Sequence, residues 1–307
     1  PVVVTNNGVA VTSEAELQRT SLIRRIFNNI DFYGASISTR CQYKKITNVF
    51  GGSGNDYRGQ YFGELNWLQY AGSIGKDYEW YRNESNKVLF NFYDKFEYNP
   101  IKKLTLYADL QYQMISYRLK GVLPDLHSTG VSGKLDEDLD YSFFNPKGGV
   151  NYDITSQMRL YASCAYTHHE PSRQNIINSV YTASKSVDSE KLLDCELGYS
   201  YKSKYFDGEL ALYYMRYFDF IVPTGIFMNR AGSIEALCDN LLAINDVAAN
   251  VPDAYRTGIE LTMKVKPHRR LAVDANMTLS QNKVRNYSCE VQSYDSNAAG
   301  ERQTTMY

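Results

Sequence analysis

Apolar and polar residues alternate along much of this chain. Between Met158 and Tyr166 apolar side chains take every second position, and more polar ones, Arg159 and Ser163 among them, fill the places between. A period of two residues places successive side chains on opposite faces of an extended strand. The segment therefore predicts a β-strand whose two faces meet different surroundings.

The same template predicts ten strands. They span residues 31–43, 46–56, 87–98, 103–117, 146–153, 158–167, 193–202, 207–222, 255–266 and 270–284. Short turns at 44–45, 99–102, 154–157, 203–206 and 267–269 alternate with long loops at 57–86, 118–145, 168–192 and 223–254. An antiparallel meander with tight turns at one end and long loops at the other is typical of an outer-membrane barrel.

The two faces of the predicted strands differ in the same way along the chain. In the segment KLTLYADLQYQMISY, Leu106 and Leu110 belong to an apolar face and Asp109 to a polar one. In YRTGIELTMKVKP, Leu261 belongs to the apolar face and Glu260 to the polar one. About five alternate apolar residues cover the roughly 9–11 residues that a tilted strand needs to cross a bilayer. We therefore predict that the apolar face meets lipid and that the polar face lines a lumen.

Tyrosine is unusually frequent, with 27 residues. Its apolar ring and polar tip suit a boundary between apolar and aqueous phases. We expect one aromatic girdle near the short turns, from Tyr98, Tyr152, Tyr199, Tyr201 and Tyr205, and a second near the loops, from Tyr117, Tyr166, Tyr217 and Phe218.

A soluble antiparallel sheet with one face on a core and one in water would show the same alternation. The strand number, the regular order of short and long connections, and the lack of a predicted helix long enough to cover so wide a sheet favour a barrel instead. We predict an all-β fold, an antiparallel up-and-down transmembrane β-barrel. Residues 31–284 carry its strands, 1–30 form a lead-in segment or external loop, and 285–307 begin a further external loop.

Composition narrows the function. With 33 basic and 34 acidic residues the net charge is −1, which offers nucleic acid no positive surface. No run of about 18 apolar residues predicts a transmembrane helix. The chain opens at Pro1 with a Thr/Asn-rich stretch rather than a signal peptide, so we expect a mature or excised piece.

The cysteines predict no metal chemistry. Their number, five, is odd and no CxxC spacing occurs, which argues against a zinc site or a disulfide framework. We expect Cys41, Cys164 and Cys195 to act as small hydrophobic residues in strands. Pairing of Cys238 with Cys289, both in predicted loops, stays open.

Several segments resemble a known family. FNPKGGVNYDITSQMRLYASCAYTHHEPSRQN, from Phe144, resembles the mid-barrel part of TonB-dependent outer-membrane receptors. DSEKLLDCELGYSYKSKYFDGELALYYMRYFDFIVPTG, from Asp188, and NVPDAYRTGIEL, from Asn250, are similar to the hairpin and strand that follow. IRRIFNNIDFYGASIS and GQYFGELNWLQYA resemble members from Bacteroides-type bacteria. The resemblance covers about residues 20 to 290.

This resemblance implies active import of a scarce nutrient across the outer membrane of a Gram-negative bacterium. The nutrient would be an iron chelate (siderophore) or haem, with cobalamin and oligosaccharide as alternatives, held by external loops. The resemblance also implies a barrel of about 22 strands around a plug domain, on which the TonB complex acts. We therefore expect this chain to be an internal piece, lacking the plug and the closing strands and unable to transport alone.

Two groups of residues are candidates for function. The candidate ligand-binding residues, in predicted external loops, are Tyr78, Trp80, Tyr81, Arg82, His168 and His169. The candidate residues facing the lumen or plug are Arg159, Glu196, Glu209, Glu260 and Asp274. Aromatic rings stack on chelates or sugars, but ordinary loop packing and a wet lumen wall explain the same residues. No metal ligands have a suitable spacing, and no cofactor is predicted.

Two other classes of protein compete with the transporter. An outer-membrane barrel enzyme needs a Ser/His/Asp or similar constellation in one cleft. The four histidines, His127, His168, His169 and His268, form no such pattern, so we predict no catalytic residue. A surface adhesin would keep the strands and need no plug.

Overall fold

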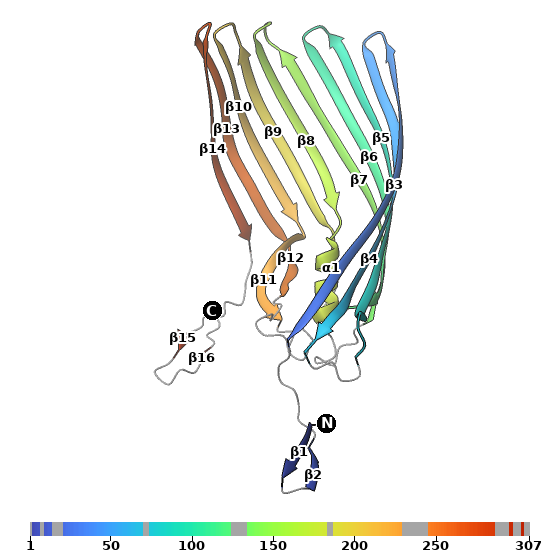
Figure 1. Cartoon of the computed structure of the whole chain (residues 1–307). Helices are drawn as coiled ribbons and strands as arrows, with labels where there is room; N and C mark the ends of the chain where they lie inside the picture. The colour runs from blue at the N-terminus through green and yellow to red at the C-terminus, as the bar shows by residue number, and fades with distance from the viewer. Residues whose placement is uncertain are drawn as a thin grey trace.

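Ten long antiparallel strands form one curved, open sheet in the computed structural model (Figure 1). The structure describes residues 2–6, 9–13, 21–69, 74–123, 134–182, 187–228, 245–285, 295–296 and 302–303. The strands of the sheet are β3 (Leu22–Tyr43), β4 (Ile46–Leu68), β5 (Tyr78–Ile101), β6 (Leu104–Val122), β7 (Lys134–Asp153), β8 (Met158–His169), β9 (Glu190–Lys202), β10 (Phe206–Phe218), β13 (Asp253–His268) and β14 (Leu271–Arg285). Each pairs with its neighbour in chain order, and β3 and β14 stand at the two ends of the sheet. The predicted all-β meander, ten strands of a partial barrel, is confirmed.

Smaller elements lie outside this sheet. Three hairpins pair β1 (Val2–Asn6) with β2 (Val9–Ser13), β11 (Phe220–Met228) with β12 (Asn245–Val251), and β15 (Asp295–Ser296) with β16 (Arg302–Gln303). The helix α1 (Arg173–Thr182) follows β8. Within the described residues no helix has the length and apolar character to cross a membrane.

The short turns gather at one rim of the sheet. They join β3 to β4, β5 to β6, β7 to β8, β9 to β10 and β13 to β14 (Figure 1). In the first, Tyr43 pairs with Ile46 around a two-residue turn, and Lys44 has a φ of 52°, as tight hairpins of this kind require.

The strands run much further on the loop side than predicted. Most of 57–86 and 118–145 is strand rather than loop, because β4 continues to Leu68, β5 begins at Tyr78, β6 ends at Val122 and β7 begins at Lys134. The strand predicted for 207–222 is also wrong, since Asp219, with a φ of 54°, separates β10 from β11.

Along β6 the apolar residues change from the outward face to the concave face. This change explains why the predicted strands ended too early on the loop side. Leu106, Leu110 and Met114 are exposed on the outward face. Beyond Met114 the apolar residues lie on the opposite, concave face, where Ile115 and Leu119 are buried. Outward positions there include the charged Arg118 and Lys120, which reach aspartates of β7 at 3.3 and 3.5 Å. The apolar outward band therefore ends near Met114, and the strands continue beyond it with charged side chains outward.

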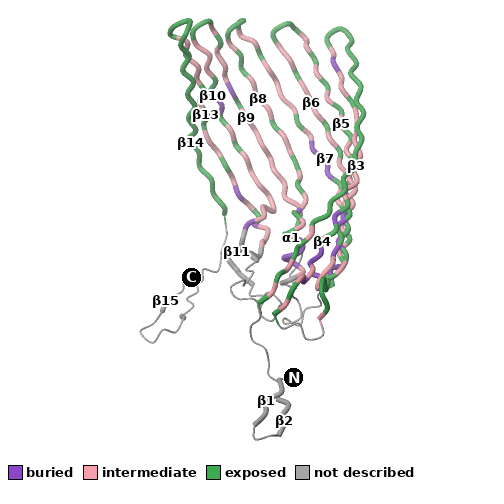
Figure 2. Tube along the Cα trace, viewed as in Figure 1, coloured by how far each residue is buried: buried purple, intermediate pink, exposed green. Residues whose placement is uncertain are grey.

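The helix α1 explains why the concave face turns apolar there. Its residues Ile176 and Ile177 join a buried cluster with Tyr117, Leu119 and Phe143 of β6 and β7. Figure 2 shows the buried positions concentrated around α1 and the loop-side half of the sheet, whereas the edge strand β14 is exposed throughout. Tyr117 therefore lies under α1, and its assignment to an outer aromatic girdle is wrong.

One further correction concerns cysteine. Cys164 of β8 lies directly opposite Cys195 of β9, and a disulfide joins them. The prediction that both act only as small hydrophobic residues is wrong. The register of the two strands brought them together, and sequence spacing does not reveal register.

Candidate functional site

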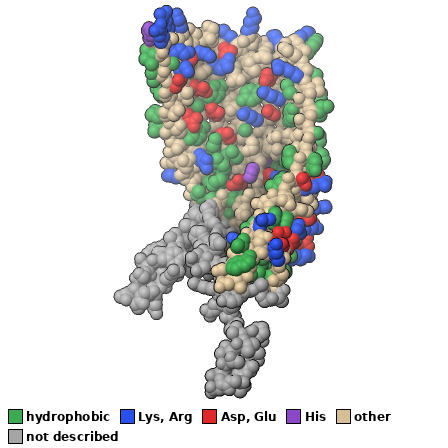
Figure 3. Space-filling model, in the orientation of Figure 1, with side chains coloured by type: hydrophobic (Ala, Val, Ile, Leu, Met, Phe, Trp, Pro, Cys, Tyr) green, Lys and Arg blue, Asp and Glu red, His purple; other side chains and the backbone are tan. Residues whose placement is uncertain are grey.

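Lys, Arg, Asp and Glu side chains are spread among hydrophobic ones over the face of the sheet seen in Figure 3, which is its concave face. Strand register places the five predicted lumen residues on this face, the face that α1 covers: Arg159, Glu196, Glu209, Glu260 and Asp274. Two of them form ion pairs, Arg159 with Asp153 at 2.7 Å and Asp274 with Lys264 at 3.0 Å.

Tyr161 of β8 connects two further residues of this group, Glu196 of β9 and Glu209 of β10. Its hydroxyl lies 2.8 Å from Glu196 Oε1 and 2.7 Å from Glu209 Oε1. A phenol has one proton and donates to one carboxylate at a time. The bridge therefore joins β8, β9 and β10 through one hydroxyl, and sequence reasoning did not find it.

Tyr161 belongs to a repeated arrangement of tyrosine over glycine. Its ring covers Gly198, the residue directly opposite on β9, where an added Cβ would lie 2.1 Å from Tyr161 Cζ. The same facing pairs recur between other strands: Tyr93 with Gly51, Tyr107 with Gly149 and Tyr213 with Gly258. Glycine leaves room for a ring laid flat across the neighbouring strand, which rigidifies the concave wall.

At the loop-side end the helix α1 is held to the wall by charged groups. Arg173, at the start of α1, stacks its guanidinium over the ring of Tyr61 at 3.7 Å and donates to Asn83 Oδ1. Glu170, just before α1, accepts a hydrogen bond from Lys87 of β5. These contacts and the cluster beneath α1 keep the segment after β8 inside the curve of the sheet.

Glu170 is half-buried yet stays ionised more readily than usual. Burial alone raises its pKa, but the hydrogen bonds from Lys87 and from its own backbone, with the charges of Lys87 and His169, more than offset burial and lower the pKa. A half-buried carboxylate that accepts a hydrogen bond from an ammonium group holds the start of α1 to β5.

The predicted ligand-binding residues fall into two separate groups. Those from Tyr78 to Arg82 lie on β5 rather than in a loop. Tyr78 is 48% exposed, and Arg82 pairs with Glu79 at 2.6 Å while its guanidinium covers the ring of Phe62. The indole nitrogen of Trp80 is buried without a hydrogen-bond partner among the described residues.

The two histidines lie at the end of β8, with β6 and β7 between them and β5. His168 stacks on Phe143 at 5.2 Å, and its Nδ1 lies 2.9 Å from Asn145 Oδ1. His169 reaches Glu190 at 3.8 Å and is mostly exposed. The described residues contain no group of His, Cys, Asp or Glu arranged to hold a metal ion.

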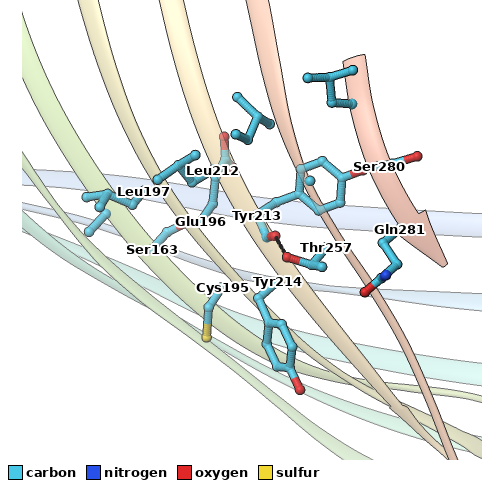
Figure 4. Close-up of a pocket in the computed structure, with 14 residues that line it drawn as sticks. Ser163, Cys195, Glu196, Leu197, Leu212, Tyr213, Tyr214, Thr257, Ser280 and Gln281 are labelled. Carbon is cyan, nitrogen blue, oxygen red and sulfur yellow. Dashed lines mark hydrogen bonds between the residues drawn. The ribbon is translucent and has the colours of Figure 1, made fainter. Parts of the chain in front are cut away.

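A hollow of about 780 Å³ lies over β8, β9, β10, β13 and β14 (Figure 4). Leu197, Leu212, Ile259 and Leu279, which line it, are exposed on the outward face. A hydrogen bond from Thr257 Oγ1 to the Tyr213 carbonyl, 3.0 Å long, crosses between β13 and β10 beside it. An apolar outward hollow suits an acyl chain better than a polar nutrient.

Comparison with solved structures supports the barrel. The chain is similar to the copper transporter OprC, with a TM-score of 0.68 and 14% identity over 85% of this chain and 39% of that one. It is also similar to the ferric yersiniabactin uptake receptor FyuA from Yersinia pestis, with a TM-score of 0.59 and 13% identity over 87% and 37%. For the ferripyoverdine receptor of the Pseudomonas aeruginosa outer membrane the TM-score is 0.59 and the identity 15%, over 91% of this chain and 36% of that one. At this identity the likeness shows the fold, and the chain spans well under half of each structure.

No curated protein matches the sequence. The family described as "TonB dependent receptor-like, beta-barrel" matches residues 4–304, nearly the whole chain. This is a family of receptors rather than of enzymes. Its barrel accounts for the strand order and for the polar side chains of the concave wall. The chain belongs to the TonB-dependent receptor-like β-barrel family.

Proposed function

We propose that this chain is part of a TonB-dependent transporter that imports a scarce nutrient across the outer membrane of a Gram-negative bacterium. The family match over residues 4–304 carries the proposal. The contrast between an apolar outward band and a charged concave wall supports it, because a barrel in lipid needs an apolar outside and tolerates a wet inside.

The orientation in the membrane follows from the same contrast. The short-turn rim faces the periplasm, and the strand extensions that carry Arg118 and Lys120 outward stand in water on the external side. In this proposal the connections within 57–86, 118–145, 168–192 and 223–254 are external, and 285–307 begin another external connection.

The partners of the chain are the lipid bilayer, the nutrient and a plug domain outside this sequence. Because an unpaired strand edge in lipid costs several kcal/mol for each unsatisfied group, β3 and β14 pair with further strands of the complete barrel. The concave wall, with Glu196, Glu209 and Glu260, faces the plug, through which the TonB complex acts.

The substrate we propose is an iron chelate or haem. The similar structures named above include a copper transporter and receptors of two ferric chelates, which supports a metal-bearing ligand. The aromatic and cationic residues from Tyr78 to Arg82, with His168 and His169, offer stacking surfaces and charge at the external end.

The test is binding and uptake by the full-length protein. Ferric chelates, haem, cobalamin and oligosaccharides are each titrated against the purified receptor, and uptake into cells is followed with and without a protonophore. We expect saturable binding of one iron-bearing ligand and uptake that stops with the protonophore. Binding of cobalamin or an oligosaccharide alone would overturn the substrate, and uptake insensitive to the protonophore would overturn the mechanism.

A matched pair of variants tests the site. Tyr78→Ala, at the external end, should weaken binding about fivefold, since stacking of one ring contributes on the order of 1 kcal/mol. Tyr205→Ala, at the other rim and 62% exposed, is the control and should bind as the unchanged protein does. Equal affinity of both variants would remove Tyr78 from the site.

A further inference from the structure

The short-turn rim carries a basic cavity that the proposed transport does not use. It has a volume of about 690 Å³ and lies between the β9–β10 turn and the β13–β14 turn. Its lining consists of the cationic residues Lys204, Lys266, Arg269 and Arg270, of His268 and Tyr205, and of Pro267, Leu271 and Ala272. Figure 3 shows the blue side chains with the purple histidine at this corner of the rim.

Most of this charge has no counter-ion. Lys266 reaches Asp207 at 3.5 Å, but Lys204, Arg269 and Arg270 form no ion pair within the part of the chain that the structure describes. The ammonium group of Lys204 lies 5.3 Å above the ring of Tyr205. The cavity therefore has an excess of positive charge in a small volume, which attracts an anion.

His268 adds an oriented hydrogen-bond donor. Its Nδ1 accepts a hydrogen bond from the backbone N–H of Arg270 at 3.3 Å. A neutral imidazole that accepts at Nδ1 carries its proton on Nε2. The ring therefore offers an N–H group beside the guanidinium groups, and phosphate oxygens are the acceptors that such a set binds best.

Other turns of the same rim do not form such a site. Lys45 donates to the carbonyl of Pro100, and Lys103 donates to the carbonyl of Ile154 at 2.8 Å. Lys44 lies over the ring of Tyr43. Lys45 and Lys103 already donate to carbonyls, and these turns carry no arginine, so the cavity between the last two turns differs from a general basic rim.

The distance of the cavity from the apolar outward band indicates its ligand. Leu271 and Val273 of β14 and Val265 of β13 are exposed on the outward face close to the turn. Arg270 and Arg269 lie one and two residues before Leu271, and Lys266 follows Val265 directly, which is about 2–5 Å of tilted strand. A headgroup layer is roughly 5–7 Å thick on each side of the hydrocarbon, so the cations stand at phosphate level.

We propose that this cavity binds the phosphate group of an anionic phospholipid, in the leaflet at the short-turn rim. The proposal rests on the membrane placement given above. Arg269 and Arg270 take the phosphate oxygens, Lys204 and Lys266 add charge, and Leu271 adjoins the acyl chains. The bound lipid ties the two turns to the membrane surface.

The experiment titrates lipid onto the delipidated full-length protein in detergent and counts bound lipids by native mass spectrometry. Phosphatidylglycerol is compared with phosphatidylcholine. We expect one phosphatidylglycerol to bind several-fold more tightly. Each of Lys204→Gln, Arg269→Gln and Arg270→Gln should weaken that binding about fivefold, the factor for a cation that contributes about 1 kcal/mol at a membrane surface. The triple variant should lose the preference.

Lys44→Gln combined with Lys45→Gln is the control, because these cations lie at the same rim and do not line the cavity. Equal preference for phosphatidylglycerol in the triple variant and the control would overturn the proposal. The proposal would also be overturned if the protein showed no preference between the two lipids and millimolar inorganic phosphate or an acidic peptide displaced the bound lipid. Failure to retain any lipid, phosphatidylcholine included, would instead count against the membrane placement itself.

Discussion

Tyr161 lies across Gly198 on the concave face, and no side chain larger than hydrogen fits between the two strands at that point. An added Cβ would lie 2.1 Å from Tyr161 Cζ. The ring in turn holds its hydroxyl between Glu196 and Glu209. One glycine thus sets the position of a hydrogen bond that joins three strands.

The first prediction follows from that contact. Gly198→Ala should displace the Tyr161 ring and lower the free energy of unfolding of the full-length protein by about 1–3 kcal/mol, the usual cost of overpacking. Unfolding in urea, followed by gel mobility, measures it. Gly148→Ala is the control, because its Cβ would meet only the Tyr107 carbonyl at 3.5 Å. A stability loss as large in the control would show that glycine matters here only for strand flexibility.

The second prediction separates the hydroxyl from the ring. Tyr161→Phe keeps the ring over Gly198 but leaves both carboxylates without their shared donor. We expect a loss of about 1–3 kcal/mol in the same urea experiment. Tyr213→Phe is the matched control, because its ring covers Gly258 while its hydroxyl has no hydrogen-bond partner among the described residues. Two variants of equal stability would contradict the bridge.

A third prediction concerns pH and the fastening of α1. Because the pKa of Glu170 is lowered in the folded protein, its stabilisation is present above the ordinary carboxyl range and is lost as pH falls through the lowered value. Lys87→Gln should therefore speed hydrogen exchange of the α1 amides severalfold at pH 7. After correction for intrinsic exchange rates, the difference should fade as the pH falls below the ordinary carboxyl range and Glu170 takes up a proton. A difference that persists unchanged to the lowest pH at which the protein stays folded would mean that Lys87 acts through packing rather than through the charge of Glu170.

The disulfide supplies the fourth prediction. Cys164 and Cys195 are separated by 31 residues, and closing a loop of that length stabilises a fold by about 3–4 kcal/mol in the chain-entropy account. Peptide mapping of unreduced protein should recover both cysteines in one linked peptide pair, whereas Cys41, which is free and exposed, should take a thiol reagent. Recovery of Cys164 and Cys195 as separate labelled thiols would contradict the pairing.

Much of the sheet was predictable because each strand repeats a simple pattern. Leu106, Leu110 and Met114 alternate with polar residues, and the tight turns interrupt that alternation where the structure does. The prediction failed beyond Met114. There the apolar residues change face, since α1 replaces the lumen water with a packed cluster around Leu119 and Leu135. A template that expects apolar residues on one face alone stops at that point.

For the candidate site, the sequence predicted which residues share a face of the sheet but not which of them touch. The phase of the strands placed Glu196, Glu209 and Glu260 together, but the tyrosine bridge and the glycine contacts depend on register. Register is set by pairing across long stretches of backbone. The short helix α1 was also missed, since its apolar residues Ile176, Ile177 and Val180 lie between polar ones in a segment too short for a clear period.

The central claim is that the outward face of this sheet meets lipid and the concave face does not. The most direct test uses Leu261→Cys and Glu260→Cys, neighbours on β13 with opposite phase, each in full-length protein in which Cys41, Cys238 and Cys289 are replaced by serine. A fluorophore on each cysteine is exposed to a lipid-borne quencher in a reconstituted bilayer. The account predicts strong quenching at position 261 and little at 260. Quenching at 260 with none at 261 would reverse the faces, and quenching at neither position would remove the membrane from the account.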